Sequence, residues 1–204
     1  MRISALLLAF TLTATASASD AARESRLDGT LPGKHDTGHR ITLDIDVACD
    51  PARTYALWAT EAGAESFFAP AAEIGGVGGP YTIIFFPADD PRGLTHGTAG
   101  AHVLAGEPGR FFAFEWVVFA GDDRKGSNAP PFAVDKMRRP DPLPTWVEIG
   151  ISPNASGSHV SFRHFGFLDT PQYRQSQAWF TRAWGGVLTS LQSTCAADPA
   201  RVRP

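Results

Sequence analysis

The fold can be inferred from PQYRQSQAWFTRAWGGVLTSLQSTCA, residues 171–196, which predicts one long amphipathic helix. Its apolar residues recur every three or four positions, so they share one helical face. These residues are Phe180, Trp184, Val187, Leu188, Leu191 and Cys195. Asp169 or Thr170 can cap the helix at its start. Gly185 and Gly186 weaken it by roughly 1 kcal/mol each relative to alanine, so we expect a bend or a close contact there.

Upstream of this helix, apolar and polar residues alternate with the period of two that is typical of half-buried strands. The first such strand is expected at 41–47, where Ile41, Leu43, Ile45 and Val47 face one side. Five more are expected at 81–86, 98–105, 111–119, 146–152 and 159–167. Turn signals such as Glu107-Pro108-Gly109 separate them. The pattern predicts a single α+β domain.

Two short helices are expected after the first strand. Asp50 is a good N-cap and Pro51 suits the first helical position, so a helix should run over 51–60. A second helix is expected over 61–68, ending before Pro70. The glycine-rich segment 75–80 precedes a strand rather than a helix, so we interpret it as a turn and not as a phosphate-binding loop.

The N-terminus carries the pattern of an export signal. Arg2 is followed by an apolar stretch over 3–12 and by small residues at 16–18, as signal peptidase requires. We therefore expect a signal peptide at 1–18, a flexible polar leader at 19–38, a folded domain at 39–196 and a tail at 197–204. The apolar stretch is too short for a stable membrane span. The expected location is periplasmic or secreted.

Composition narrows the function classes. Of the 204 residues, 43% are hydrophobic and 19% charged, which is neither a disordered nor a multi-pass membrane composition. The formal net charge of −3 argues against nucleic acid as the main partner, because phosphate binding needs a basic face. We find no serine nucleophile elbow, no paired-carboxylate motif and no zinc spacing, so no catalytic residue, metal or cofactor is assigned.

Several motifs resemble those of one known family. They are YALWAT at 55–60, ESFFAP at 65–70, GGPY at 78–81, FAFEW at 112–116, HFGF at 164–167 and Ala183-Trp184. In this order and spacing they resemble the START-like superfamily, in the branch related to the C-terminal domain of heat-shock-protein ATPase activators. The resemblance implies a helix-grip fold, with a curved antiparallel sheet around the C-terminal helix and an apolar cavity between them. Two departures are Phe67, where the family usually has Trp, and the long proline-rich insertion at 121–144.

Alternation along the strands then selects the residues that would face the helix. They are Tyr81, Ile83, Phe85, Phe112, Phe114, Trp116, Phe162 and His164, opposite Phe180 and Trp184. If the sheet grips the helix closely, these side chains are core. If it stands off, they line an apolar pocket of the kind that binds small molecules.

His164 is the polar member of this inward set. It could orient a ligand or act as an acid or base near neutral pH. The alternative is a buried histidine that is hydrogen-bonded to a backbone carbonyl or to a neighbouring strand. Glu115 and Arg163 alternate to the outer face and are not placed with it.

The two cysteines are expected to pair. Cys49 continues the inward series of the first strand, and Cys195 continues that of the long helix. In the helix-grip fold that the resemblance implies, the short helices support the distal half of the long one, which brings both thiols to the same end. Export permits oxidation.

Three functions remain open from the sequence. The first is an exported module that binds a small hydrophobic or amphipathic molecule. The second is an enzyme of the cyclase or hydrolase kind, using the same cavity with His164 as acid or base. The third is a protein-interaction domain that uses the 121–144 segment, with an unknown protein partner. Co-chaperone activity is not expected, because it requires a cytosolic ATP-dependent chaperone.

Overall fold

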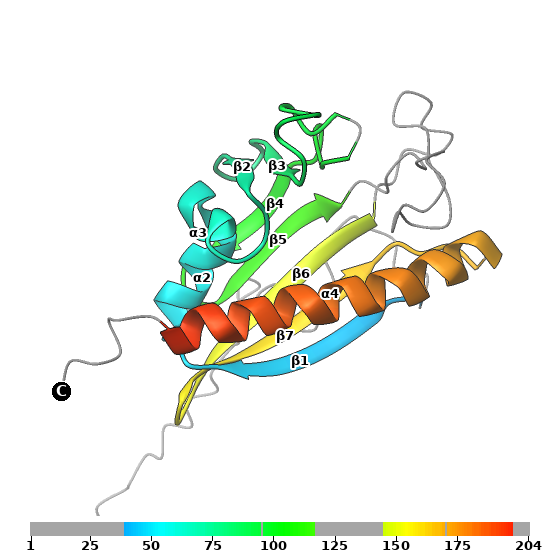
Figure 1. Cartoon of the computed structure of the whole chain (residues 1–204). Helices are drawn as coiled ribbons and strands as arrows, with labels where there is room; N and C mark the ends of the chain where they lie inside the picture. The colour runs from blue at the N-terminus through cyan, green and yellow to red at the C-terminus, as the bar shows by residue number, and fades with distance from the viewer. Residues whose placement is uncertain (1–38, 95, 117–144, 170, 198–204) are drawn as a thin grey trace, which may run out of the picture.

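The computed structural model describes residues 39–94, 96–116, 145–169 and 171–197. Five antiparallel strands form the main sheet in the order β1-β7-β6-β5-β4 (Figure 1). Their bounds are Ile41–Val47 (β1), Val103–Glu107 (β4), Phe111–Trp116 (β5), Thr145–Asn154 (β6) and Gly157–Phe165 (β7). The helices are Pro51–Ala59 (α2), Glu61–Glu65 (α3) and Pro171–Ala197 (α4). This is the α+β helix-grip arrangement that the sequence predicted.

The strand alternation is confirmed by the register. Ile41 lies opposite His164, Leu43 opposite Phe162 and Ile45 opposite Val160, so inward residues of β1 meet inward residues of β7. Val147 lies opposite His164 in the neighbouring pair of strands. Because side chains alternate across a strand, this register collects the apolar residues on one face of the sheet.

The strand expected at 81–86 is present as β3 (Tyr81–Ile84) and follows the expected glycine-rich turn, but its partner strand β2 (Ala71–Ile74) was not predicted. Strand β2 pairs antiparallel with β3 in a separate two-stranded sheet. The expected strand at 98–105 also begins later than predicted, at Val103. The reason is a turn in which the amide of Ala101 donates to the carbonyl of Thr98 at 2.9 Å, with Gly100 at a φ of +88°. An isolated bridge between Pro80 and His102 connects the hairpin to the main sheet.

Both short helices begin at a capping side chain, of which Asp50 was predicted and Thr60 was not. The Asp50 carboxylate accepts a hydrogen bond from the amide of Arg53 at 2.8 Å and caps α2. The Thr60 hydroxyl accepts one from the amide of Gly63 at 3.1 Å and caps α3. These side chains satisfy amides that have no partner within the helix, which sets where each helix starts.

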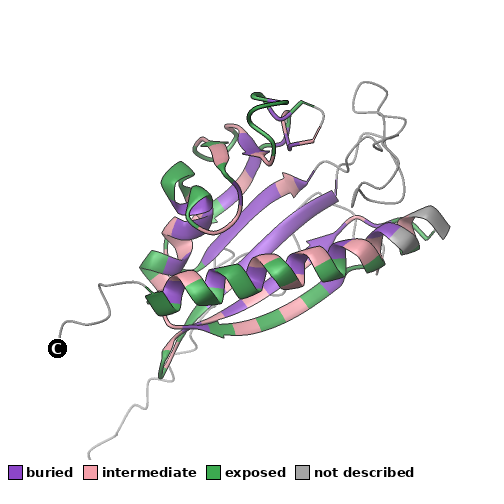
Figure 2. Cartoon of the chain, viewed as in Figure 1, coloured by how far each residue is buried: buried purple, intermediate pink, exposed green. Residues whose placement is uncertain are grey.

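Helix α4 lies across the concave face of the sheet, and its buried side faces the strands (Figure 2). Phe180, Trp184, Leu188 and Leu191 are each no more than 2% exposed, which confirms the helical period. The close contact expected at Gly185 and Gly186 is not present, because a Cβ atom added at either glycine would meet nothing within 4 Å. Within the part of the chain that is described, no helix is both long and apolar enough to cross a bilayer.

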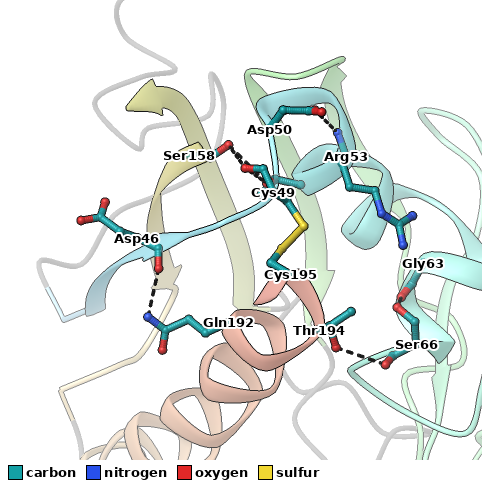
Figure 3. Close-up of a disulfide and its surroundings, with 11 residues drawn as sticks. Asp46, Cys49, Asp50, Arg53, Gly63, Ser66, Ser158, Gln192, Thr194 and Cys195 are labelled. Atoms are coloured by element: carbon teal, nitrogen blue, oxygen red, sulfur yellow. Dashed lines mark hydrogen bonds between the residues drawn. A yellow bond between two sulfur atoms is a disulfide. The ribbon is translucent and has the colours of Figure 1, made fainter. Parts of the chain in front are cut away.

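The predicted disulfide is present and joins the end of β1 to the last turn of α4. Cys49 and Cys195 are bonded across 146 residues of sequence, with Cα atoms 5.0 Å apart (Figure 3). Hydrogen bonds reinforce the same junction. The side chain of Gln192 donates to the carbonyl of Asp46 at 3.0 Å, and the hydroxyl of Ser158 donates to the carbonyl of Cys49 at 2.8 Å. The C-terminal half of α4 is therefore held to the sheet by covalent and polar contacts.

Candidate functional site

The apolar side chains predicted to face the helix belong to one hydrophobic cluster, and His164 lies against it. Trp116, Phe162 and His164 contact the ring of Phe180 or Trp184 on α4, whereas Tyr81, Phe112 and Phe114 contact one another. The exposed fractions of the predicted residues are Tyr81 0%, Ile83 0%, Phe112 2%, Phe114 0%, Trp116 2%, Phe162 0%, His164 0%, Phe180 1% and Trp184 2%. Phe85 is half-buried and packs against the same cluster. We call these residues, together with Trp58, Phe67 and Phe68, the aromatic cluster; its members come from the strands, from α2, from the turn after α3 and from α4.

Phe68, which follows α3, lies among rings of the aromatic cluster from α2, α4 and the strands. Its ring centroid lies 5.5 Å from that of Trp184 and 5.9 Å from that of Trp116, where the rings stack. It also lies 5.9 Å from Phe85 in an edge-to-face arrangement. Phe67, Phe68 and Phe85 are all partly exposed. The cluster therefore continues from fully buried rings to rings that reach solvent.

Trp58 places a third indole in the cluster. It comes from α2 and is 0% exposed. Its ring centroid lies 4.9 Å from Phe67, 6.3 Å from Phe162 and 6.4 Å from Phe114. The side chain thus fills the space between the turn after α3 and the inner face of the sheet.

His164 is held by hydrogen bonds at both ring nitrogens. The indole Nε1 of Trp184 donates to Nδ1 at 3.0 Å, and Nε2 lies 2.8 Å from the hydroxyl of Thr145. That hydroxyl donates to the carbonyl of Trp116 at 2.8 Å. Because an indole N–H can only donate, Nδ1 must be the acceptor and the proton sits on Nε2. The neutral Nε2–H tautomer therefore satisfies every partner.

Burial sets the charge of this histidine. Desolvation lowers the pKa of His164 from 6.5 to about 3, because the surrounding rings disfavour the charged form. The environment raises the pKa of Tyr81 well above 10 for the same reason. At neutral pH His164 is uncharged, with no free nitrogen lone pair. The arrangement corresponds to the second of the two interpretations, a buried histidine bonded to a neighbouring strand.

Two groups near the aromatic cluster, each fully buried, make no hydrogen bond to any residue that the structure describes. They are the indole Nε1 of Trp58 and the hydroxyl of Ser176. Ser176 is 0% exposed and lies one helical turn before Phe180 on the buried side of α4. A buried donor without a partner costs free energy and calls for an explanation such as an absent water or ligand.

Sequence reasoning missed three residues that the structure places in this site. Thr145 continues the inward series of Val147 and Ile149, but the predicted strand began one residue too late to include it. Ser176 continues the helical series that contains Phe180, but the prediction of the buried face used apolar residues only and so left out a serine. Phe68 lies outside regular structure, so only its place in the resemblance motif pointed to it.

The outer face of the sheet is separate from this site. Glu115 and Arg163 lie there, as predicted from alternation. The carboxylate of Glu115 pairs with Nδ1 of His102 at 2.9 Å, and Arg163 donates to the hydroxyl of Ser161 at 2.7 Å. Among the residues that are described, no group of three or more His, Cys, Asp or Glu side chains could hold a metal ion.

Comparison with known proteins agrees with this architecture. No protein-family model and no curated protein matches the chain. Solved structures do match. A protein of Mesorhizobium loti is 17% identical, with a TM-score of 0.57 over 78% of this chain and 99% of its own. The Aha1 dimer of Colwellia psychrerythraea is 15% identical, with a TM-score of 0.53 over 78% and 97%.

An AHSA1-like protein of Rhizobium etli is 20% identical, with a TM-score of 0.50 over 78% of this chain and 82% of its own. At these identities the likeness concerns the fold alone. The chain therefore has the helix-grip fold that the resemblance of its sequence motifs implied. Its architecture is similar to those of the Colwellia Aha1 protein and the Rhizobium AHSA1-like protein.

Proposed function

We propose that this chain is an exported binding protein that holds a small hydrophobic or amphipathic molecule between α4 and the sheet. The observation that carries the proposal is the aromatic cluster, which spans both layers and reaches solvent through Phe67, Phe68 and Phe85. Apolar and aromatic side chains with few polar groups are what small-molecule sites use. The unpartnered donors of Trp58 and Ser176 add polar groups of the kind that orient a ligand.

Export is part of the proposal. It is supported by the signal-like pattern at 1–18 and by the Cys49–Cys195 disulfide, since disulfides persist in oxidising compartments. Sequencing the N-terminus of the protein isolated from its host tests this part. Cleavage after Ala18 is the expected result, and a chain that retains Arg2 in the mature protein contradicts it.

Native mass spectrometry of the protein isolated from its own host tests binding. We expect a reproducible extra mass that is lost when the protein is denatured. The bare mass of the polypeptide, together with no uptake of added apolar compounds, would overturn the proposal.

The enzyme alternative has less support. A general acid or base needs an accessible nitrogen and a pKa near the working pH. His164 has both nitrogens engaged, and burial holds its pKa at about 3. The protein-interaction alternative rests on residues 121–144, which lie outside the described part of the chain.

A further inference from the structure

We propose that the indole N–H of Trp58 is a specificity-determining donor, which recognises an uncharged acceptor oxygen on a flat aromatic ligand. This inference rests on the proposed binding function and adds the chemical class of the ligand. A carbonyl or ether oxygen on an aromatic ring system is the chemistry that fits.

The starting observation is that Trp58 differs from two other buried tryptophans of the chain. The indole of Trp184 donates to His164 at 3.0 Å, and that of Trp146 donates to the carboxylate of Glu148 at 3.0 Å. The indole Nε1 of Trp58 is just as inaccessible, yet no atom of the described residues accepts its proton. A buried tryptophan usually finds an acceptor, so the absence of one among these residues points to an acceptor from outside them.

The surroundings of Trp58 define the rest of the ligand. The rings around it belong to Phe67, Phe68, Phe114 and Phe162. None of these side chains carries a charge or an acceptor, so a charged ligand group would be buried without compensation. Aromatic walls favour flat rings that can stack or meet them edge to face. Since an indole N–H only donates, the complementary group must be an acceptor.

The partly exposed rings of Phe67 and Phe68 connect the Trp58 side chain to the surface. Phe67 and Phe68 both contact Trp58 and are both partly exposed, with centroids 5.8 Å apart. These two rings therefore lie between solvent and the Trp58 ring, and the proposed ligand would enter beside them. The polar group of the ligand would be the part that penetrates furthest.

A matched pair of probes tests the inference on the full chain. We would measure the Kd of 2-acetylnaphthalene and of 2-ethylnaphthalene, which differ in whether a carbonyl oxygen or a methylene is present. One net hydrogen bond corresponds to roughly a two- to twelve-fold tighter Kd for the ketone. Trp58→Phe should abolish this preference while the ethyl compound still binds. Trp179→Phe is the control, because it makes the same change on α4 at a partly exposed tryptophan whose ring contacts Phe180 at 4.9 Å.

Each outcome decides something different. Equal affinity of the wild-type protein for both probes overturns the inference but leaves the proposed binding function standing. A ketone preference that survives in Trp58→Phe also overturns it, because another group must then bind the carbonyl oxygen. Failure of both probes to bind the wild-type protein overturns the inference and counts against the binding function for aromatic ligands.

A second measurement covers the case in which Trp58→Phe does not fold. In the wild-type protein labelled with ¹⁵N-tryptophan, the indole N–H resonance of Trp58 should move downfield when 2-acetylnaphthalene is added. The ethyl compound should not move it in that direction. An indole resonance that responds identically to both compounds would contradict the proposed hydrogen bond.

Discussion

Trp184 donates its indole proton to Nδ1 of His164 over 3.0 Å, and this bond joins the middle of α4 to β7. On the other side of the ring, Nε2 lies 2.8 Å from the hydroxyl of Thr145 on β6. Protonation of Nδ1 would turn an acceptor toward the Trp184 donor into a second donor. The contact between helix and sheet therefore requires neutral His164.

We expect a pH-dependent stability from this arrangement. Unfolded His164 takes up a proton below pH 6.5, whereas folded His164 does so only near pH 3. The unfolded state then binds more protons in this window, so the free energy of unfolding decreases as the pH falls. The loss should reach about 2 kcal/mol between pH 8 and pH 5. Urea titrations at the two values measure it.

His164→Gln is the control for this prediction. Glutamine has no titratable group in this range, so the variant should lose much less stability between pH 8 and pH 5. His159 on the outer face serves as the exposed histidine for comparison. Its Nδ1 lies 2.9 Å from Oδ1 of Asp46. If His159→Gln removes the pH dependence and His164→Gln does not, the assignment to His164 is wrong.

Reduction of the disulfide should destabilise the protein strongly. The Cys49–Cys195 bond closes a loop between two residues that are 146 positions apart in the sequence. A loop of this size corresponds to roughly 4 to 5 kcal/mol in the chain-entropy model. The thermal midpoint with and without reductant measures the effect, and intact mass should show a two-dalton deficit before reduction. The double variant Cys49→Ser/Cys195→Ser should be unaffected by reductant, and an unchanged midpoint of the wild-type protein would contradict the prediction.

The paired glycines of α4 offer a gain in stability. A Cβ atom added at Gly185 or Gly186 meets nothing within 4 Å. Replacing either by alanine should therefore stabilise the protein by about 0.5 to 1 kcal/mol, because alanine loses less backbone entropy in a helix. Gly63→Ala in α3 is the matched control. Its Cβ would lie 2.2 Å from the carbonyl oxygen of Ala56, so we expect a loss of about 1 to 3 kcal/mol.

Removing the Phe68 ring should affect binding and stability together. Phe68 contacts Trp58, Trp116 and Trp184, so Phe68→Ala opens the aromatic cluster at its partly exposed side. We expect a loss of about 2 kcal/mol in the free energy of unfolding, below the value for a fully buried phenylalanine. Affinity for 2-acetylnaphthalene should fall at least about tenfold.

Phe86→Ala is the control for the Phe68 prediction. The Phe86 ring is 53% exposed and lies against His96, away from the aromatic cluster. Its removal should change stability by no more than about 0.5 kcal/mol. An equal loss of affinity in the two variants would argue that the probe binds elsewhere.

Local patterns in the sequence determined much of this protein. The three- and four-residue spacing of Phe180, Trp184 and Leu188 was sufficient to predict α4 and its buried face. The alternation in β1 was sufficient to predict which residues of that strand face the core. Both predictions work because side-chain direction follows directly from backbone geometry, which is local. Strand β2 was not predicted, because a four-residue strand is too short to show a period.

Only the tertiary structure decided how polar groups are paired within that core. The sequence placed His164 inward but could not choose between an exposed base and a buried, bonded one. That choice depends on Trp184 and Thr145, which are 20 and 19 residues away along the chain. The lack of a partner for Trp58 is equally a property of the packed core. A hydrogen bond forms only where folding brings donor and acceptor within about 3 Å, and distance in space is not written in local sequence patterns.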